Sequence, residues 1–247
     1  MELLLRNMND TQRSEDVCTR QQRIAELARE RPQECCTALN HYLTVDWLKA
    51  AYDRVKPDRA PGIDGQSWIE YGQKLEENLR GLLQRVKSGS YLAPPVKRVH
   101  IPKGEGPETR GIGRPTIEDK VWQRAISMLL EPIFEPDFKS FSCGFRPGRS
   151  AHEAWARIWS QGTHQRIQWI LEVDIRKYFD TLKHEWLRKF LDRRVRDGVI
   201  RRLMGKWLKA GVWEKGQMSY PEEGTPQGGV ISPLLSNIYL HEVLDCW

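Results

Sequence analysis

A short apolar run that ends in a carboxylate constrains the fold of this chain more than any other feature. Residues 169–174 (WILEVD) are apolar enough to form a mostly buried strand, which places Asp174 at its carboxyl end. A turn flanked by cations follows, and Phe179 lies in it, five residues after Asp174. The sequence therefore predicts a sheet in which one strand presents a carboxylate beside an aromatic turn.

Helices are predicted on both sides of this strand from the spacing of apolar residues and from capping residues. Pro233 suits the first position of the last helix, where proline is tolerated best, with Ser232 as its cap. The predicted helices cover residues 45–55, 67–87, 116–130, 150–160, 182–194, 199–210 and 232–247. Hydroxyl side chains that can cap a helix are found at the start of four of them: Thr44, Ser67, Thr116 and Ser150.

A second extended element is predicted near the middle of the chain. Residues 91–102 are rich in proline and valine, residues 104–107 have turn chemistry, and residues 110–113 return as a hairpin. Residues 1–20 are polar and patternless, so we expect them to be poorly ordered, and residues 21–43 show helical spacing. The predicted class is α+β, with helices around a small antiparallel sheet.

The positive charge of the chain is concentrated in one segment. The 247 residues carry a formal charge of +6 and a pI of about 9.1. Residues 188–215 contain ten basic and three acidic side chains, so this segment is +7 and the rest sums to −1. A concentrated basic stripe favours a polyanionic partner such as RNA, with a solvated helix face as the alternative.

Composition also argues against several classes of protein. The five cysteines include no C-x-x-C pair, which argues against a zinc site and for a reducing compartment. The chain lacks a run of about 18 apolar residues, so we expect no membrane span. We therefore expect a cytoplasmic protein with no membrane partner.

The strand, carboxylate and turn at residues 169–180 have the chemistry that a polymerase needs. Nucleotidyl transfer uses a carboxylate that bridges two Mg²⁺ ions about 3.5–4 Å apart. It also needs backbone amides for a triphosphate and a bulky wall beside the sugar. Asp174, the turn and Phe179 can supply these three features. The alternative is an aspartate at a strand end that only caps a turn.

Several motifs together resemble the reverse transcriptases encoded by group II introns, which are retroelement maturases. The string at residues 174–184 (DIRKYFDTLKH) is similar to the first catalytic motif of that family. Four further blocks occur in the family's order: residues 60–65 (APGIDG), 99–103 with 110–116 (VHIPK, RGIGRPT), 130–134 with 144–150 (LEPIF, GFRPGRS) and 224–235 (GTPQGGVISPLL). The resemblance covers roughly residues 43–247. It implies a right-hand polymerase architecture: an N-terminal extension (1–43), fingers (44–160) and a partial palm (161–247), without a thumb.

The resemblance implies a role for each matching residue in the site. Asp174 would be the catalytic, metal-bridging carboxylate, with the backbone carbonyl of Ile175 as a second Mg²⁺ ligand. Phe179 would be the steric gate that rejects a ribose 2′-hydroxyl. Lys103 and Arg110 would bind the triphosphate of the incoming dNTP.

Gln227 would lie along the nucleotide and the nascent base pair, with Gly228 and Gly229 permitting close backbone approach. For RNA, the resemblance points to Arg146 and Arg149 as backbone contacts. The basic segment adds four candidate RNA-binding residues: Arg193, Arg194, Arg201 and Arg202.

The sequence also departs from the family pattern. Gly111 and Arg114 stand where the family usually has proline and an aliphatic residue, and Cys143 stands where tyrosine is common. The family's second catalytic motif, an aromatic-Ala-Asp-Asp hairpin, should follow the last helix and is not found before Trp247. We therefore expect these 247 residues alone to be inactive as a polymerase.

The implied function is Mg²⁺-dependent, RNA-directed DNA synthesis with a maturase role, and the implied partners are intron RNA, template–primer and dNTP. A homodimer, or a second chain that supplies the rest of the palm and the thumb, is a further possibility. Two alternatives stay open at this point: a non-catalytic RNA-binding splicing factor, and a related bacterial reverse transcriptase acting in defence or DNA repair.

Overall fold

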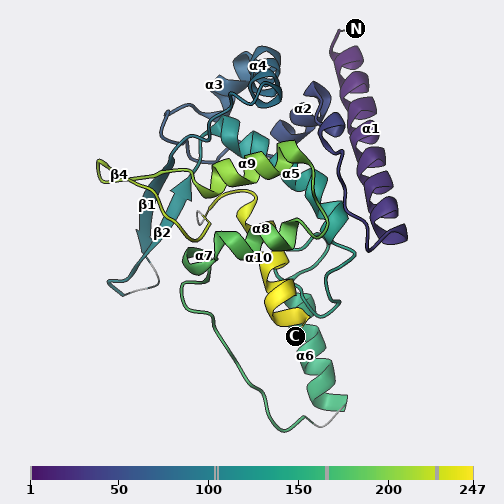
Figure 1. Ribbon diagram of the computed structural model, residues 1–247, viewed down its shortest axis with the longest axis vertical. Helices are drawn as coiled ribbons and strands as arrows, with labels where there is room; N and C mark the ends of the chain where they lie inside the picture. The colour runs from purple at the N-terminus through teal and green to yellow at the C-terminus, as the bar shows by residue number, and fades with distance from the viewer. Residues whose placement is uncertain (1, 103, 105, 165–166, 226–227, 247) are drawn as a thin grey trace.

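The computed structural model describes residues 2–102, 104, 106–164, 167–225 and 228–246 (Figure 1). In the described residues, helices surround a small sheet, which confirms the predicted α+β class. The helices are α1 (Glu2–Glu30), α2 (Val45–Asp53), α3 (Trp68–Gln73), α4 (Leu75–Lys87), α5 (Ile117–Phe134), α6 (Ala151–His164), α7 (Tyr178–Thr181), α8 (His184–Leu191), α9 (Gly198–Leu208) and α10 (Ser232–Leu240), with a 3₁₀ turn at Asn40–Tyr42 and a π-helical turn at His241–Asp245.

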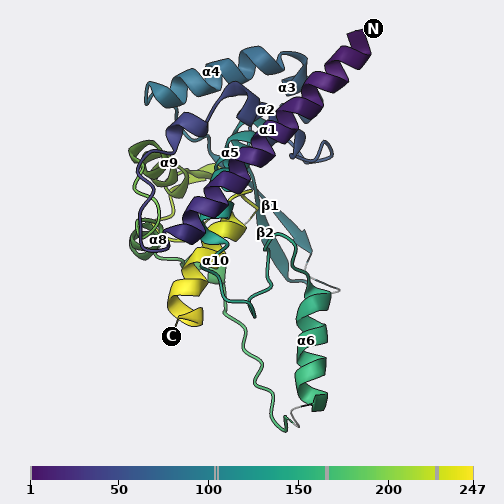
Figure 2. The same ribbon diagram turned by 90° about the vertical axis from the view of Figure 1, so that its right-hand side faces the viewer.

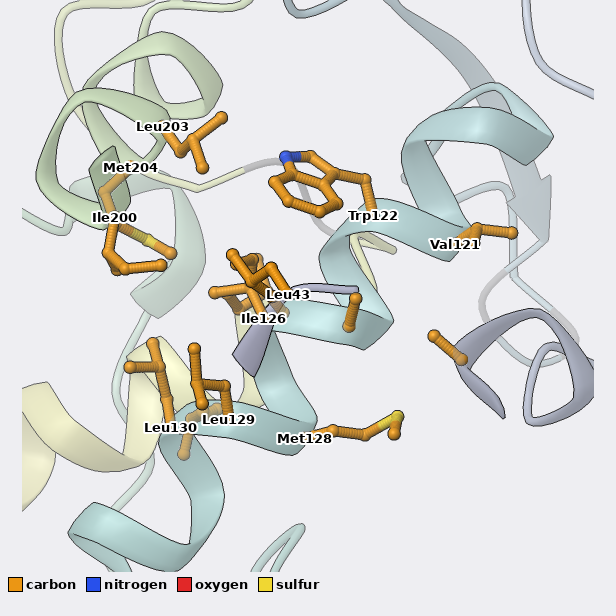
Figure 3. Packing of buried hydrophobic residues seen from close by; sticks show 14 of the residues in the cluster. Leu43, Val121, Trp122, Ile126, Met128, Leu129, Leu130, Ile200, Leu203 and Met204 are labelled. Atoms are coloured by element: carbon orange, nitrogen blue, oxygen red, sulfur yellow. The ribbon is translucent and has the colours of Figure 1, made fainter. Parts of the chain in front are cut away.

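Helix α5 is the centre of the hydrophobic core. It begins after Thr116, whose hydroxyl accepts a hydrogen bond from the Asp119 amide, as the sequence predicts. Helices α1, α2, α3 and α10 all contact it. Figure 3 shows Trp122 and Ile126 of α5 facing Leu203 of α9 in the middle of the molecule. Each buried side chain of this size stabilises the fold by about 1.5–3 kcal/mol.

Most predicted helix starts are confirmed, and the differences have local causes. Thr44 caps α2, and Ser67 with Glu70 forms a capping box on α3. The helix expected through residue 87 is divided at Lys74, whose backbone is not helical. The last helix includes Ser232 as its first residue, so its cap is Ile231 and not Ser232.

The polar start of the chain is helical, because α1 runs from Glu2 to Glu30. Its second half packs on the core through buried Val17, Ile24 and Ala28. Figure 2 shows α1 running along the outside of α2 and α5. Tertiary contacts of this kind give a polar helix the stability that its own sequence pattern lacks.

The sheet has the order β2-β1-β3-β4 and is mixed, which corrects the prediction of a purely antiparallel sheet. Strands β1 (Val96–Pro102) and β2 (Thr109–Arg114) form the predicted hairpin. Strand β3 (Val212–Glu214) pairs with β1 in parallel and with β4 (Gln217–Ser219) antiparallel. The β3–β4 hairpin was not predicted, although its Lys215-Gly216 turn has positive φ at both residues, as tight hairpins require.

The prediction of a buried strand at residues 169–174 is wrong in this structure. The segment is an exposed, extended connection from α6 to α7, with Trp169 90% exposed (Figure 1). A strand requires backbone partners on at least one side. Among the described residues, no strand pairs with this segment, so its apolar side chains face solvent.

Within the described residues, we find no helix with both the length and the apolar character needed to cross a bilayer.

Candidate functional site

A cavity of about 1200 Å³ lies beside the β1–β2 hairpin and is called the hairpin cavity below. Its walls are the hairpin, residues 173–180, the end of α9 with the start of β3, and residues 221–225. The fold thus brings together four segments that are widely separated in the sequence. The cavity is large enough for a nucleotide-sized ligand.

Four of the predicted site residues line this one cavity: Asp174, Ile175, Phe179 and Arg110. Asp174, Ile175 and Arg110 are exposed to it, and Phe179 is half-buried in the turn. The roles predicted for Lys103 and Gln227 concern positions that lie outside the described residues. The structure therefore gathers the carboxylate, the aromatic residue and one of the two predicted cations.

The turn that carries Phe179 is fixed by its neighbours. Lys177 has a left-handed backbone (φ 52°), which lets the chain reverse into α7. The Tyr178 hydroxyl donates a hydrogen bond to the Ser236 carbonyl oxygen on α10 at 2.8 Å. Burial raises the pKa of Tyr178 to about 12, so the phenol keeps the proton that it donates. A left-handed lysine costs on the order of 1 kcal/mol, which these contacts offset.

The segment at residues 223–225 is bound directly to this turn. The Gly224 amide donates to the Leu182 carbonyl oxygen at 2.7 Å, and His184 Nε2 donates to the Gly224 carbonyl oxygen at 2.6 Å. Gly224 has φ +84°, and a Cβ there would lie 2.7 Å from the Phe179 carbonyl oxygen. Glycine is thus required at this position by both backbone conformation and space. His184 thus connects the start of α8 to residue 224.

Gly228 makes a similarly close backbone approach to strand β2 of the hairpin. Its φ is +110°, and a Cβ there would collide with the Gly113 carbonyl oxygen and crowd the Ile112 side chain of β2. Gly224 therefore contacts the Phe179 turn and Gly228 contacts the hairpin, and the described residues 224–225 and 228–231 are called the glycine-rich loop below. The neighbour of Gly228 among the described residues is β2, and close approach of Gly228 to a nucleotide stays a prediction.

Sequence reasoning missed the polar cluster on the hairpin wall. His100 Nε2 lies 2.5 Å from Glu214 Oε1, and Arg98 Nη1 lies 3.7 Å from Glu214 Oε2. The hydrogen bond with His100 lowers the pKa of Glu214. Arg98 and His100 are two positions apart in β1, so their side chains lie on the same face of the strand. The sequence could have indicated this. Their partner could not be found because β3 was not predicted.

Behind the cavity, a buried carboxylate joins three elements. Asp119 is 2% exposed and accepts hydrogen bonds from the Tyr91 hydroxyl, from Trp207 Nε1 at 2.8 Å and from Gln123 Nε2 at 2.8 Å. Burial raises the pKa of Asp119, while its three donors act in the opposite direction. The Gln123 Oε1 atom in turn accepts from the Ile231 amide at 3.3 Å, which fixes the far end of the glycine-rich loop.

Two of the predicted RNA-binding arginines are engaged inside the protein. Arg146 is 7% exposed and binds the Glu135 carboxylate and two backbone carbonyl oxygens. Arg194 is also buried, where it binds the carbonyl oxygens of Ala28 and Pro32. Both guanidinium groups connect elements of the fold, so neither is available to RNA in this conformation.

The other predicted arginines reach the surface. Arg149, Arg193 and Arg201 each form an ion pair there, with Glu153, Glu242 and Asp192 respectively. Such exposed pairs contribute about 0–1 kcal/mol, so a phosphate group can replace the carboxylate at little cost. Arg202 is exposed and has no carboxylate partner among the described residues.

The charged groups of the hairpin cavity suit a phosphorylated ligand. Arg98, Arg110 and Lys177 line it beside the carboxylates of Asp174 and Asp180. Among the described residues, no three acidic, histidine or cysteine side chains converge to hold a metal ion. Carboxylate and carbonyl oxygens such as those of Asp174 and Ile175 are nevertheless the ligand type that Mg²⁺ prefers, with substrate phosphates completing its coordination.

A family profile and several curated proteins match this chain. A profile of the family described as "Reverse transcriptase (RNA-dependent DNA polymerase)" matches residues 101–247. Protein YkfC of Escherichia coli (strain K12) is 42% identical over 190 residues, which cover 76% of this chain and 50% of YkfC. The group II intron-encoded protein LtrA of Lactococcus lactis subsp. cremoris is 36% identical over 223 residues, covering 90% of this chain and 37% of LtrA.

Among solved structures, a chain of the "Partial Cas6-RT-Cas1--Cas2 complex" matches with a TM-score of 0.55 and 21% identity. The match covers 85% of this chain and 35% of that chain. At this level of identity the likeness concerns the fold. The chain spans half or less of the length of these relatives.

Proposed function

Because the chain belongs to the reverse transcriptase (RNA-dependent DNA polymerase) family, with group II intron-encoded proteins among its relatives, we propose that the hairpin cavity holds the incoming nucleotide of RNA-templated DNA synthesis. The observation that carries the proposal is the meeting of Asp174, Phe179 and Arg110 on one cavity. The activity is proposed for the whole protein. Residues 44–160 would act as its fingers and residues 161–247 as part of its palm.

Each lining residue has a defined task in this proposal. Arg110 binds the triphosphate through its planar guanidinium, and Phe179 packs against the sugar at the position that a 2′-hydroxyl would occupy. Asp174 and the Ile175 carbonyl would hold Mg²⁺, which supplies charge neutralisation at the phosphates. The left-handed turn at Lys177 and the Gly224 contacts keep Phe179 in place.

A maturase role is the second part of the proposal. Intron RNA would contact the half-buried Arg149, the exposed Arg193 and the basic segment at residues 188–215. The support is the +7 charge of that segment and the matches to intron-encoded proteins. Binding of this kind weakens steeply as salt is raised, because phosphate contacts release counterions.

The nucleotide site is tested by dNTP binding. Equilibrium dialysis would measure binding of radiolabelled dATP, with Mg²⁺ and an RNA template–DNA primer whose next template base is uracil and whose primer lacks the 3′-hydroxyl, so that the dATP is not incorporated. Arg110→Ala is expected to weaken dATP binding about tenfold or more, because it removes a charge-assisted contact. Arg80→Ala, an exposed arginine of α4, is the matched control. Equal binding by the wild type and Arg110→Ala would overturn the assignment of the cavity.

Primer extension by the same proteins separates binding from catalysis. In a form of the protein that extends primers, Asp174→Asn should abolish extension while leaving dATP binding within about threefold. Extension that survives Asp174→Asn would contradict the proposed role of this carboxylate. Template–primer binding without extension by any form of the protein would favour a non-catalytic RNA-binding function.

A further inference from the structure

A pocket of about 210 Å³ lies between α5, α10 and the loop at residues 138–147. It is called the α5–α10 pocket below, and its described lining shares no residue with that of the hairpin cavity. Two arginines and two glutamates line it, so the formal charge of the described lining is zero: Arg124, Glu131, Glu135 and Arg146. A pocket without excess positive charge does not favour a phosphate group, and its volume is below that of sites for drug-sized ligands. The pocket therefore suits a small ligand without charge.

Two of the four charged side chains satisfy each other. Arg146 Nε lies 3.1 and 3.2 Å from the two carboxylate oxygens of Glu135, and Arg146 Nη1 donates to two backbone carbonyl oxygens. This pair forms part of the pocket wall. Recognition of a ligand is therefore left to Arg124 and Glu131.

Arg124 and Glu131 face each other without a hydrogen bond. Arg124 Nη1 lies 3.8 Å from Glu131 Oε1, which is too long for one. Neither side chain has a hydrogen-bond partner among the described residues, and the Nε atom of Arg124 is buried. The two side chains are 33% and 28% exposed, so a ligand can reach them although little water does. Burial raises the pKa of Glu131, and a ligand that donates hydrogen bonds would stabilise its carboxylate.

An exposed aromatic ring lines the same pocket. Phe145 is 76% exposed and has a left-handed backbone (φ 54°), which is unusual for a bulky side chain. Asn237 of α10 helps to hold this loop, because its Nδ2 donates to the Gly144 carbonyl oxygen at 2.9 Å. Backbone strain of this kind is concentrated at sites where a side chain is positioned for a ligand. A flat, exposed ring is the surface on which an unstacked nucleobase binds.

Guanine is the nucleobase whose edge matches Arg124 and Glu131. Its Watson–Crick edge has two adjacent donors, N1–H and N2–H, beside the acceptor O6. A carboxylate accepts from two donors in parallel, and a guanidinium group donates to O6. Adenine, cytosine and uracil each offer a donor at only one position of this edge. An uncharged base also agrees with the zero formal charge of the lining.

We propose that the α5–α10 pocket binds a guanine base. Phe145 stacks on the base, Glu131 accepts hydrogen bonds from N1 and N2, and Arg124 donates to O6. The base belongs either to a single-stranded RNA or to a free guanine nucleotide, whose sugar and phosphates stay outside the pocket. This site is distinct from the proposed nucleotide site, and its occupation requires neither Mg²⁺ nor polymerase activity.

The test compares three short fluorescent RNAs: oligouridine with one central guanine, the same strand with inosine at that position, and oligouridine alone. Inosine lacks the 2-amino group and so loses one donor to Glu131. Fluorescence anisotropy with the 247-residue chain in EDTA should show the guanine RNA binding about tenfold more tightly than the inosine RNA. The three RNAs share the same phosphates, so differences between them report the base.

Variants assign the preference to the pocket. Glu131→Gln should bring the guanine and inosine RNAs to within about twofold of each other, because an amide cannot accept from two donors in parallel. Glu77→Gln, at an exposed glutamate of α4, is the matched control and should keep the preference.

A second pair of variants tests the aromatic ring. Phe145→Asn should weaken binding of the guanine RNA about tenfold, because it removes the stacking surface. Asparagine tolerates a left-handed backbone, so the thermal unfolding temperature should not fall. Phe141→Asn removes an exposed ring outside the pocket and should leave binding unchanged.

Competition by guanosine monophosphate identifies the source of the base. Displacement of the guanine RNA at micromolar concentration would assign a free nucleotide, and no displacement below about 1 mM would assign an RNA strand. Both results support guanine recognition. Equal binding of the guanine and inosine RNAs by the wild type would overturn the proposal. So would a guanine preference that survives both Glu131→Gln and Phe145→Asn.

Discussion

The Thr225 amide donates a hydrogen bond to the Phe179 carbonyl oxygen at 2.8 Å, and so joins the glycine-rich loop to the aromatic turn of the hairpin cavity. The two residues lie far apart in the sequence. Because Gly224 also binds the next turn through Leu182, the loop and the turn are held as one unit.

Gly224→Ala should displace the Phe179 turn. Its Cβ would lie 2.7 Å from the Phe179 carbonyl oxygen, and its φ of +84° disfavours any L side chain. We expect a loss of about 2–4 kcal/mol in the free energy of unfolding, measured by urea denaturation. Gly65→Ala is the control, because Gly65 has φ +71° with open space around it and should lose only about 1 kcal/mol. Equal losses would show that the contact with Phe179 is unimportant.

Asp119→Asn should be rescued by a second substitution. Both carboxylate oxygens of Asp119 accept hydrogen bonds. In Asp119→Asn, the new side-chain amide nitrogen would face Gln123 Nε2, and because both groups are donors they cannot form a hydrogen bond. We expect the single variant to lose about 2 kcal/mol of unfolding free energy. In the double variant with Gln123→Glu, the new carboxylate can accept from both the side-chain amide introduced at position 119 and the Ile231 backbone amide.

The double variant should therefore recover at least half of that loss in thermal or urea unfolding. The Gln123→Glu variant alone should be destabilised, because it places a second carboxylate against Asp119. Additive losses in the double variant would contradict the hydrogen-bond arrangement.

Asp197→Asn should make the stability of the protein less dependent on pH in the acid range. Burial opposes ionisation of Asp197, but the amides of Leu39, Asn40, Val199 and Ile200 bind its carboxylate and lower its pKa below the ordinary value. A lowered folded-state pKa contributes stability above the unfolded-state pKa of 3.8, and that contribution is lost as pH falls through the folded-state pKa.

Urea unfolding at several pH values would measure the difference between the wild type and Asp197→Asn. We expect about 2 kcal/mol near pH 7 and a shrinking difference below about pH 4. Asp58→Asn, an exposed turn residue, serves as the control with little difference at any pH. A difference that grows as pH falls would reverse the sign and refute the assignment.

Arg146→Met should destabilise the protein, whereas Arg202→Met should not. Arg146 joins the Glu135 carboxylate to the carbonyl oxygens of Lys139 and Ser142, and its removal leaves these groups unpaired. We expect a loss of about 3 kcal/mol for Arg146→Met and less than about 0.5 kcal/mol for Arg202→Met. Unchanged stability of Arg146→Met, with weaker RNA binding, would instead support the role predicted from sequence.

The sequence by itself determined the local elements of this protein and the family to which it belongs. Capping residues such as Thr44, Ser67 and Thr116 act within one turn of helix, so their effect can be read from residues three positions apart. The motifs at residues 174–184 and 224–235 identified the family because several blocks occur in a fixed order. The resemblance also led to the expectation that Arg110, Asp174 and Phe179 lie close together, and they line one cavity.

Only the tertiary structure decided which chemical groups face one another. The parallel pairing of β1 with β3, and with it the His100–Glu214 contact, joins strands that are far apart in the chain. The sequence does not distinguish Arg146 from Arg202. In the structure, Arg146 is buried and paired with the Glu135 carboxylate, whereas Arg202 is exposed and has no carboxylate partner among the described residues. The same holds for residues 169–174, whose apolar pattern predicts a strand that has no partner among the described residues. Strand pairing and burial depend on long-range contacts, and a local pattern does not contain them.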